Sequence, residues 1–278
     1  MIEIGKKQCL NVVKKTDFGV YLGTEEEKIL LPIKQVPEDT EIGDAFTVFV
    51  YRDSEDRLIA TVREPLIQLG EIRKLKVAQT AAIGAFLDWG LEKDLFLPFK
   101  EQTYKVQPGE ECLVVLYVDK SSRLCASMRH VYNYLTEAEG YEVDSPVTGT
   151  VIEINPELGA FVAVEDQYYG MIPKNELYAK LHVGDTIEGR VMKIREDGKL
   201  TISLRKKAYL QMDEDSQKIL DDLIQAGGRF PFTDKASPEL IRAQFNMSKN
   251  EFKRAVGRLL KEKKIVINPD SIELVKGQ

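Results

Sequence analysis

Hydrophobic and polar residues alternate along residues 147–204 in short runs that end at a glycine, a proline or a Gly–acid pair. Runs of this length and alternation are typical of half-buried β-strands. The pattern predicts five strands, at residues 147–154, 160–164, 170–173, 187–194 and 200–204. Because barrel closure removes exposed sheet edges, five short strands in so short a segment favour a small five-stranded barrel.

The landmarks of this segment occur three times in register, which predicts a triplicated domain. A glycine allows close backbone approach between the first two strands, and a Gly–acid pair makes the turn before the fourth strand. The aligned residues are Gly19, Gly84 and Gly159; Pro32, Pro98 and Pro173; Gly43-Asp44, Gly109-Glu110 and Gly184-Asp185; and Leu58, Leu124 and Leu200 at the start of the last strands. The predicted domains are 1–64, 65–143 and 144–208, and residues 130–142 are expected to form a helical connector that ends at Gly140.

After Arg205 the hydrophobic period becomes helical. Ser237 is expected to cap one helix and Ser248, with Glu251 in a capping box, the next. The apolar residues expected to share the buried faces of three helices are Ile219, Leu220, Leu223 and Ile224; Leu240, Ile241 and Phe245; and Phe252, Val256, Leu259 and Leu260. Two strands, at 265–268 and 272–275, then complete the order of a winged helix over residues 209–278.

The third repeat resembles the S1 RNA-binding domain, which is a five-stranded barrel of the oligonucleotide-binding fold. The matching segments are Leu158-Gly159-Ala160-Phe161-Val162, Gly170-Met171-Ile172, Glu176-Leu177, Val183-Gly184-Asp185 and Leu200-Thr201-Ile202-Ser203-Leu204. The first two repeats match more loosely. Three such barrels followed by a winged helix resemble the conserved virulence factor B family of bacterial proteins over essentially the whole chain. This resemblance implies a multidomain, mainly β, cytoplasmic RNA-binding protein that regulates gene expression, virulence genes included.

Aromatic residues beside the strand-two glycines are the expected base-stacking residues, because RNA bases stack on rings exposed on a barrel face. The candidate sets are Phe18 and Tyr21 with Lys34 and Arg57; Phe86 with Lys100 and Arg123; and Phe161 with Lys174 and Lys199. S1 domains often carry aromatics on both sides of this glycine, and only the first repeat does so. Many also carry a histidine where this chain has its three aligned prolines. The alternative is that these rings belong to the barrel cores, since strand side chains alternate between faces.

The charge distribution identifies one further candidate surface. The net charge is −6, whereas residues 249–264 hold seven Lys or Arg against two Glu. Lys253, Arg254, Arg258 and Lys261 are expected opposite the apolar stripe of their helix, where they can face phosphates together. A solvated helix face explains the same charges equally well.

Catalysis, cofactors and metal binding find no support in the sequence. His130 and His182 stand alone, Gly227-Gly228 lacks the Lys-Ser/Thr of a phosphate loop, and Glu25-Glu26-Glu27 fits a solvated loop. Three cysteines without a C-x-x-C pair indicate reduced, buried thiols, and we expect neither a signal peptide nor a membrane span. The expected partner is single-stranded RNA, with DNA, the ribosome or RNA polymerase as alternatives. The competing hypothesis is a protein-interaction module that docks on the transcription or translation machinery.

Overall fold

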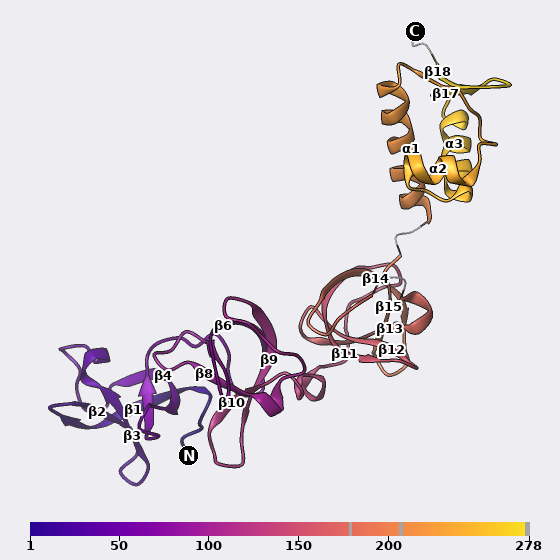
Figure 1. Cartoon of the computed structure of the whole chain (residues 1–278). Coiled ribbons are helices and arrows are strands. Elements are labelled where there is room, and N and C mark those ends of the chain that lie inside the picture. The colour runs from indigo at the N-terminus through magenta and orange to yellow at the C-terminus, as the bar shows by residue number, and fades with distance from the viewer. Residues whose placement is uncertain (178–179, 206–207, 276–278) are drawn as a thin grey trace. The chain divides into compact units, whose positions relative to one another are not determined.

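The computed structural model describes residues 1–177, 180–205 and 208–275, and only the backbone of residues 208–214 (Figure 1). The chain forms two compact units, Met1–Leu204 and Arg205–Gln278. The first unit contains three successive five-stranded β-structures, and the second is a small helical domain with a three-stranded sheet. The multidomain, mainly β fold predicted from the sequence is therefore confirmed.

The first and third β-structures are closed barrels with the same strand order, β1-β2-β3-β5-β4 and β11-β12-β13-β15-β14. The second is a sheet of order β10-β9-β6-β7-β8 whose end strands lie beside each other, so this barrel is nearly closed. The strands of barrel 1 are β1 (Lys7–Thr16), β2 (Gly19–Gly23), β3 (Lys28–Pro32), β4 (Ala45–Arg52) and β5 (Leu58–Thr61). Those of barrel 2 are β6 (Ile72–Ala81), β7 (Gly84–Asp88), β8 (Leu95–Pro98), β9 (Glu111–Val118) and β10 (Leu124–Ser127). Those of barrel 3 are β11 (Pro146–Asn155), β12 (Gly159–Val164), β13 (Tyr168–Pro173), β14 (Thr186–Ile194) and β15 (Leu200–Ser203).

The aligned glycines and prolines face each other across strands two and three of every barrel. Gly19 pairs with Pro32, and the equivalent pairs are Gly84 with Pro98 and Gly159 with Pro173. A Cβ atom on any of these glycines would collide with a backbone carbonyl oxygen of the neighbouring strand. Each proline then ends its strand and begins a short 3-10 helix: η1 (Ile33–Gln35), η2 (Phe99–Glu101) and η4 (Lys174–Glu176). The close approach that was inferred from the sequence is confirmed.

The Gly–acid turns make the same backbone bonds in all three barrels. The N–H groups of Gly43, Gly109 and Gly184 each donate to a valine carbonyl of the first strand, over 2.8 Å. The first strand shifts register directly after that valine in every barrel, at Val12, Val77 and Val151. The triplication therefore extends from sequence landmarks to individual hydrogen bonds.

Barrels 1 and 2 share one hydrophobic cluster. Phe49 and Tyr51 of β4 pack edge to face against Trp89, with ring centroids 5.7 and 6.2 Å apart. Trp89 is 3% exposed, and its indole Nε1–H donates to the carbonyl of Lys93. Because the three rings are buried together, the two barrels are fixed to each other by apolar packing.

The predicted helical connector between barrels 2 and 3 is wrong. Only η3 (Val131–Tyr134), a single 3-10 turn, forms there. Thr136 then makes a parallel β-bridge with Tyr168, in which its N–H donates to Gln167 and its carbonyl accepts from Tyr169. These bonds to barrel 3 take the backbone groups that a longer helix would have used. Val131 and Leu135 pack with Leu113 and Ala163, which joins barrels 2 and 3.

The C-terminal unit has the element order of a winged helix. Its elements are α1 (Ala208–Gln225), β16 (Arg229–Phe230), α2 (Pro238–Phe245), α3 (Lys249–Lys261), β17 (Ile265–Ile267) and β18 (Ile272–Leu274), with sheet order β16-β18-β17. The Ser237 side chain accepts from the N–H of Leu240, and Ser248 and Glu251 form the capping box. The caps predicted from the sequence are confirmed, whereas β16 was not predicted.

Three leucine and isoleucine positions expected in the buried helix faces are exposed instead: Ile224, Leu240 and Leu260. In α3 the buried stripe consists of Phe252, Ala255, Val256 and Leu259. Leu260 lies one residue, and hence about 100° of helix rotation, beyond Leu259, which turns its side chain out of the stripe. Alanine at position 255 completes the stripe, although its small side chain gave no strong hydrophobic signal. The domain boundaries near residues 64, 143 and 208 stay predictions.

We expect Gly257→Ala to raise the free energy of unfolding of the winged helix by about 1 kcal/mol. Gly257 lies in the interior of α3, and a Cβ there would meet nothing within 4 Å. Glycine inside a helix costs about 1 kcal/mol relative to alanine. Urea unfolding followed by circular dichroism at 222 nm measures the change. Gly109→Ala is the matched control, because its site is equally open but has a φ of +90°, so that substitution should destabilise. A loss of stability in Gly257→Ala would contradict the expectation.

Candidate nucleic-acid interface

The outer face of barrel 1 holds a groove over β2, β3 and β5. Phe18 is 55% exposed, and its ring meets that of Tyr21 edge to face with centroids 6.3 Å apart. Lys28 Nζ lies 6.0 Å from the centroid of the Tyr21 ring. The groove is lined by Phe18, Tyr21, Lys28, Ile29, Leu30, Asp53, Arg57, Leu58 and Ile59. Exposed rings beside an ammonium group provide both a stacking surface and a positive charge.

The cations of barrel 1 differ from those predicted. Arg57 lines the groove, but its guanidinium binds Asp53 and Glu55, each over 2.7 Å. Burial alone would raise the pKa of Asp53, but the hydrogen bonds from Arg57 outweigh it and lower that pKa. Lys34 is exposed on η1 and does not line the groove. Lys28 was missed in the sequence; the hairpin register that pairs it with Gly23 could have indicated it.

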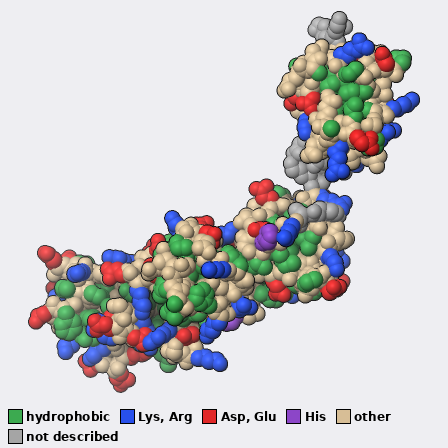
Figure 2. Space-filling model, in the orientation of Figure 1, with side chains coloured by type: hydrophobic (Ala, Val, Ile, Leu, Met, Phe, Trp, Pro, Cys, Tyr) green, Lys and Arg blue, Asp and Glu red, His purple; other side chains and the backbone are tan. Residues whose placement is uncertain are grey.

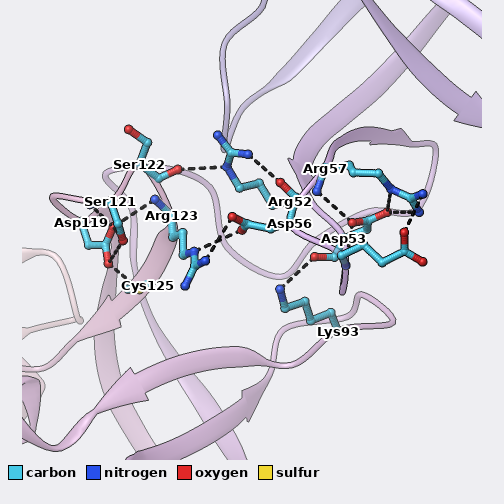
Figure 3. Close-up of polar contacts among 11 residues, drawn as sticks. Arg52, Asp53, Asp56, Arg57, Lys93, Asp119, Ser121, Ser122, Arg123 and Cys125 are labelled. Atoms are coloured by element: carbon cyan, nitrogen blue, oxygen red, sulfur yellow. Dashed lines mark hydrogen bonds and ion pairs between the residues drawn. The ribbon is translucent and has the colours of Figure 1, made fainter.

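Arg123 of barrel 2 is an inter-barrel contact. Its guanidinium makes two hydrogen bonds of 3.1 Å to the carboxylate of Asp56 in barrel 1 (Figure 3). These bonds hold the pKa of Asp56 below its usual value. Arg52 donates to the carbonyls of Ser122 and Asp56, so polar contacts from both barrels meet here (Figure 3). The predicted phosphate-binding role of Arg123 therefore competes with an ion pair that joins the barrels.

The remaining predicted residues of barrel 2 are Phe86 and Lys100. Phe86 is half-buried and its ring centroid lies 5.3 Å from that of Phe96 on β8. A hollow beside Phe86 is also lined by Asp53, Glu92 and Asp94 against the one cation Lys93, which makes its lining acidic on balance. Lys100 is exposed on η2.

In barrel 3 a residue from the connector lies against the predicted stacking ring. Tyr132 meets Phe161 at 5.9 Å and Tyr169 at 5.0 Å between ring centroids. Lys199 Nζ lies 4.8 Å from the centre of the Tyr169 ring and 3.7 Å from a carboxylate oxygen of Asp197. Lys174 lies 3.9 Å from Glu157. The rings and cations of this barrel thus already contact one another or nearby carboxylates.

The residue opposite each stacking candidate on the neighbouring strand is basic in barrel 1, neutral in barrel 2 and acidic in barrel 3. Tyr21 pairs with Lys14, Phe86 with Gln79 and Phe161 with Glu153 on the first strand of each barrel. Directly opposed residues on one face of a sheet lie close together, so these partners set the local charge beside each ring. The face of barrel 1 is therefore the most favourable of the three for a polyanion.

The basic face of α3 is largely free of carboxylates. Lys253, Arg254 and Lys261 are exposed, and none has a carboxylate oxygen of the described residues within 4 Å. Arg258 differs, because its Nε lies 2.8 Å from Glu262. Figure 2 shows Lys and Arg side chains on the visible face of this unit. The predicted orientation opposite the apolar stripe agrees with the buried residues of α3.

The cysteines are poor nucleophiles where they are buried. Burial raises the pKa of Cys112 to about 12 and that of Cys125 to about 11, which keeps both thiols protonated at neutral pH. Cys9 is exposed on β1, which corrects the expectation that all three are buried.

Among the described residues, no group of three or more His, Cys, Asp and Glu side chains has an arrangement suited to a metal ion. No helix in the described part of the chain has the length and apolar character needed to cross a membrane.

Three barrels of the oligonucleotide-binding type followed by a winged helix define a multidomain protein assembled from domains of nucleic-acid-binding type. Family models agree with this division. The S1 domain matches residues 4–63 and 69–129, "Virulence regulatory factor CvfB, second domain" matches 134–206, and "CvfB-like winged helix domain" matches 217–274. The S1 model thus matches the first two barrels, whereas the third barrel, expected to be the nearest to S1, matches a model specific to the family.

Two bacterial proteins are similar to this chain in sequence over nearly its full length. The chain is 32% identical to conserved virulence factor B of Staphylococcus aureus, covering 91% of this chain and 88% of that protein. It is 33% identical to the uncharacterized protein YitL of Bacillus subtilis, covering 94% and 90%. The chain belongs to the conserved virulence factor B family. A crystal structure of a multidomain protein with nucleic acid binding domains from Streptococcus pneumoniae shares the fold, with a TM-score of 0.51, 24% identity and 98% coverage of both chains.

Proposed function

We propose that this protein is a non-enzymatic, cytoplasmic RNA-binding regulator of bacterial gene expression. The observation that carries the proposal is the groove of barrel 1, where exposed Phe18, half-buried Tyr21 and exposed Lys28 lie together. Single-stranded RNA fits this groove because its bases can stack on rings while its phosphates approach an ammonium group. The name of the Staphylococcus aureus relative supports a link to virulence.

The other predicted residues contribute to different degrees in this proposal. Lys253, Arg254 and Lys261 supply positive charge to phosphates, because no described carboxylate within 4 Å neutralises them. Arg57, Arg123, Lys199 and Arg258 are already engaged with carboxylates, so their share of the affinity is smaller. Phe86 and Phe161 are secondary stacking sites, since other rings pack against them.

We expect the triple variant Lys253→Gln, Arg254→Gln, Lys261→Gln to bind single-stranded RNA less tightly and with a weaker salt dependence. Each neutralised phosphate of a single strand contributes about 0.7 to the slope of log affinity against log salt, so the slope should flatten by about 2. Affinity should fall similarly for unrelated RNA sequences, because phosphate contacts carry little sequence information. Fluorescence anisotropy with a labelled oligonucleotide at two or more salt concentrations measures both effects.

Arg258→Gln is the matched control, since Arg258 lies on the same helix but is paired with Glu262. It should change the slope much less than replacement of Lys253, Arg254 or Lys261. A triple variant with an unaltered slope would show that this face of α3 takes no part in RNA binding. If the unaltered protein itself fails to bind single-stranded RNA, the proposed function is wrong.

The second candidate function is a protein-interaction module that docks on the ribosome or RNA polymerase. Two observations favour it: the net charge is −6, and several barrel cations are paired with carboxylates. A polyanion would have to displace those carboxylates or avoid them. In this case the protein should co-sediment with ribosomes or polymerase after nuclease treatment and should show no affinity for free single-stranded RNA.

A further inference from the structure

Each barrel exposes a large apolar residue directly before its strand-two glycine. These residues are Phe18, Ile83 and Leu158, and each is more than half exposed. Single exposed apolar residues are ordinary on protein surfaces, but recurrence at one structural position in three barrels is not expected from chance exposure. The position lies in the tight turn between the first two strands, where it supports no described core cluster.

Barrels 1 and 2 add a second exposed apolar residue beside the first. Ile33 and Phe99 begin η1 and η2 and are 50% and 48% exposed. The N–H of Ile33 donates to the carbonyl of Phe18 over 3.0 Å, and that of Phe99 to Ile83 over 3.3 Å. Barrels 1 and 2 therefore each place one phenylalanine and one isoleucine next to each other at the same end, in opposite order. We call Phe18/Ile33 and Ile83/Phe99 the two apolar pairs.

An exposed lysine follows each apolar pair along the chain. Lys34 and Lys100 are exposed, and neither has a carboxylate oxygen of the described residues within 4 Å. Arg57 and Arg123, in the loops directly before β5 and β10, are both bound to carboxylates. Lys34 and Lys100 thus place positive charge beside the apolar pairs, whereas the two arginines are already paired with carboxylates.

Barrel 3 lacks this combination. Lys174 stands where the second apolar residue would be, as its N–H donates to the carbonyl of Leu158 over 3.0 Å. Its ammonium group lies 3.9 Å from Glu157, the residue before Leu158. Leu158 is therefore exposed beside Lys174, whose ammonium group lies near Glu157, and not beside a second apolar residue as in the other two barrels. It serves as an internal comparison for the other two barrels.

We propose that the two apolar pairs, each with its following lysine, are binding subsites for single-stranded RNA. The Phe18/Ile33 pair extends the groove of barrel 1, which Phe18 also lines, and the Ile83/Phe99 pair is a separate subsite on barrel 2. In each subsite a nucleobase lies on the phenylalanine and contacts the isoleucine, while Lys34 or Lys100 contacts a neighbouring phosphate. This chemistry fits RNA better than a protein segment, because an exposed ring beside an unpaired ammonium group matches an alternation of apolar bases and negative phosphates. The inference rests on the proposed function and extends the binding surface from the groove of barrel 1 to barrel 2.

The packing between barrels 1 and 2 fixes the distance between the two subsites. Phe49, Tyr51 and Trp89 hold these barrels together, so the two subsites keep a constant separation. A strand long enough to reach both binds the second subsite intramolecularly, which raises the overall affinity without a new kind of contact. Loss of either subsite should then lower the affinity for a long oligonucleotide and leave a weaker, single-subsite complex.

The decisive experiment compares Phe99→Ala with Leu158→Ala in the full-length protein, using a fluorescently labelled oligouridine of about 20 nucleotides. Phe99→Ala should weaken binding about tenfold, the effect of losing one stacked base. Leu158→Ala removes an equally exposed side chain from barrel 3 and should leave the affinity unchanged. Melting temperatures of both variants should match that of the unaltered protein, because neither side chain is buried.

The charge contribution is tested with the double variant Lys34→Gln, Lys100→Gln. Its slope of log affinity against log salt should flatten by about 1.4, that is, about 0.7 for each lost phosphate contact. An oligonucleotide with abasic positions should bind Phe99→Ala and the unaltered protein equally, yet still respond to the lysine variant. Unaltered RNA affinity of Phe99→Ala, in a protein that does bind RNA, would overturn the subsites while leaving the proposed function intact. Equal losses in Phe99→Ala and Leu158→Ala would also overturn them.

Discussion

Replacing Phe18 and Tyr21 together with alanine is expected to weaken binding of single-stranded RNA by at least about thirtyfold. Each stacked base contributes roughly 1–3 kcal/mol, so two lost stacking surfaces cost at least about 2 kcal/mol, and 1.4 kcal/mol is a factor of ten. Phe18 is 55% exposed and Tyr21 is half-buried, and neither belongs to the hydrophobic core of barrel 1. The melting temperature should therefore change little.

Ile42→Ala provides the control for this double variant. Ile42 is 68% exposed in barrel 1 but does not line the groove, so its truncation should leave RNA affinity unaltered. Fluorescence anisotropy gives the affinities, and differential scanning calorimetry gives the melting temperatures. A double variant that melts many degrees lower yet binds RNA normally would identify the two rings as structural and would count against the stacking surface.

Replacing Trp89 with alanine is expected to lower the free energy of unfolding by about 3–5 kcal/mol, the usual cost of truncating a large buried aromatic residue. The indole ring is 3% exposed and packs edge to face on Phe49 and Tyr51 across the junction of barrels 1 and 2. Its removal leaves a cavity between the barrels. Part of the lost stability should therefore come from weaker packing of barrel 1 against barrel 2. Trp89 is the single tryptophan of the chain, so circular dichroism rather than tryptophan fluorescence should follow urea unfolding.

Trp89→Phe separates packing from the hydrogen bond to Lys93. Phenylalanine retains much of the ring contact but removes the Nε1–H donor, so it should destabilise the protein less than alanine. Limited proteolysis should cut the Trp89→Ala variant faster in the segment between β5 and β6 than the unaltered protein. A Trp89→Ala protein as stable as the unaltered one would show that the aromatic cluster does not hold the barrels together.

Local turn chemistry made most of the fold predictable. The aligned glycines, prolines and Gly–acid pairs act on backbone that lies within the same repeat, and their bonds recur at Gly43, Gly109 and Gly184. Ser237 and Ser248 likewise cap helices through N–H groups only three residues away. Such signals are readable because cause and effect lie close together along the chain. The prediction of a helix over residues 130–142 was wrong because the course of this segment depends on a distant residue: Thr136 forms a β-bridge with Tyr168 in the next barrel.

The candidate site was only partly predictable. The residue types were chosen from spacing, and Phe18 and Tyr21 do lie together. Whether a cation is available depends on its neighbours in space: Arg123 binds Asp56 of another barrel, and Lys28 reaches Tyr21 across a hairpin. The exposure of Ile33 and Phe99 was not predictable either, because nothing in the sequence distinguishes them from buried apolar residues that follow a proline.

By itself, the sequence determined the number, order and kind of the domains, because repeated turn residues and the change of hydrophobic period act through local backbone geometry. The tertiary structure decided which surfaces remain open and charged. Packing between barrels buries Trp89, places Tyr132 against Phe161 and pairs Arg123 with Asp56. Five lysines and arginines keep no described carboxylate within 4 Å: Lys34, Lys100, Lys253, Arg254 and Lys261. The physical reason is that burial and ion pairing depend on distances between residues far apart in the chain, which hydrophobic pattern and spacing do not encode.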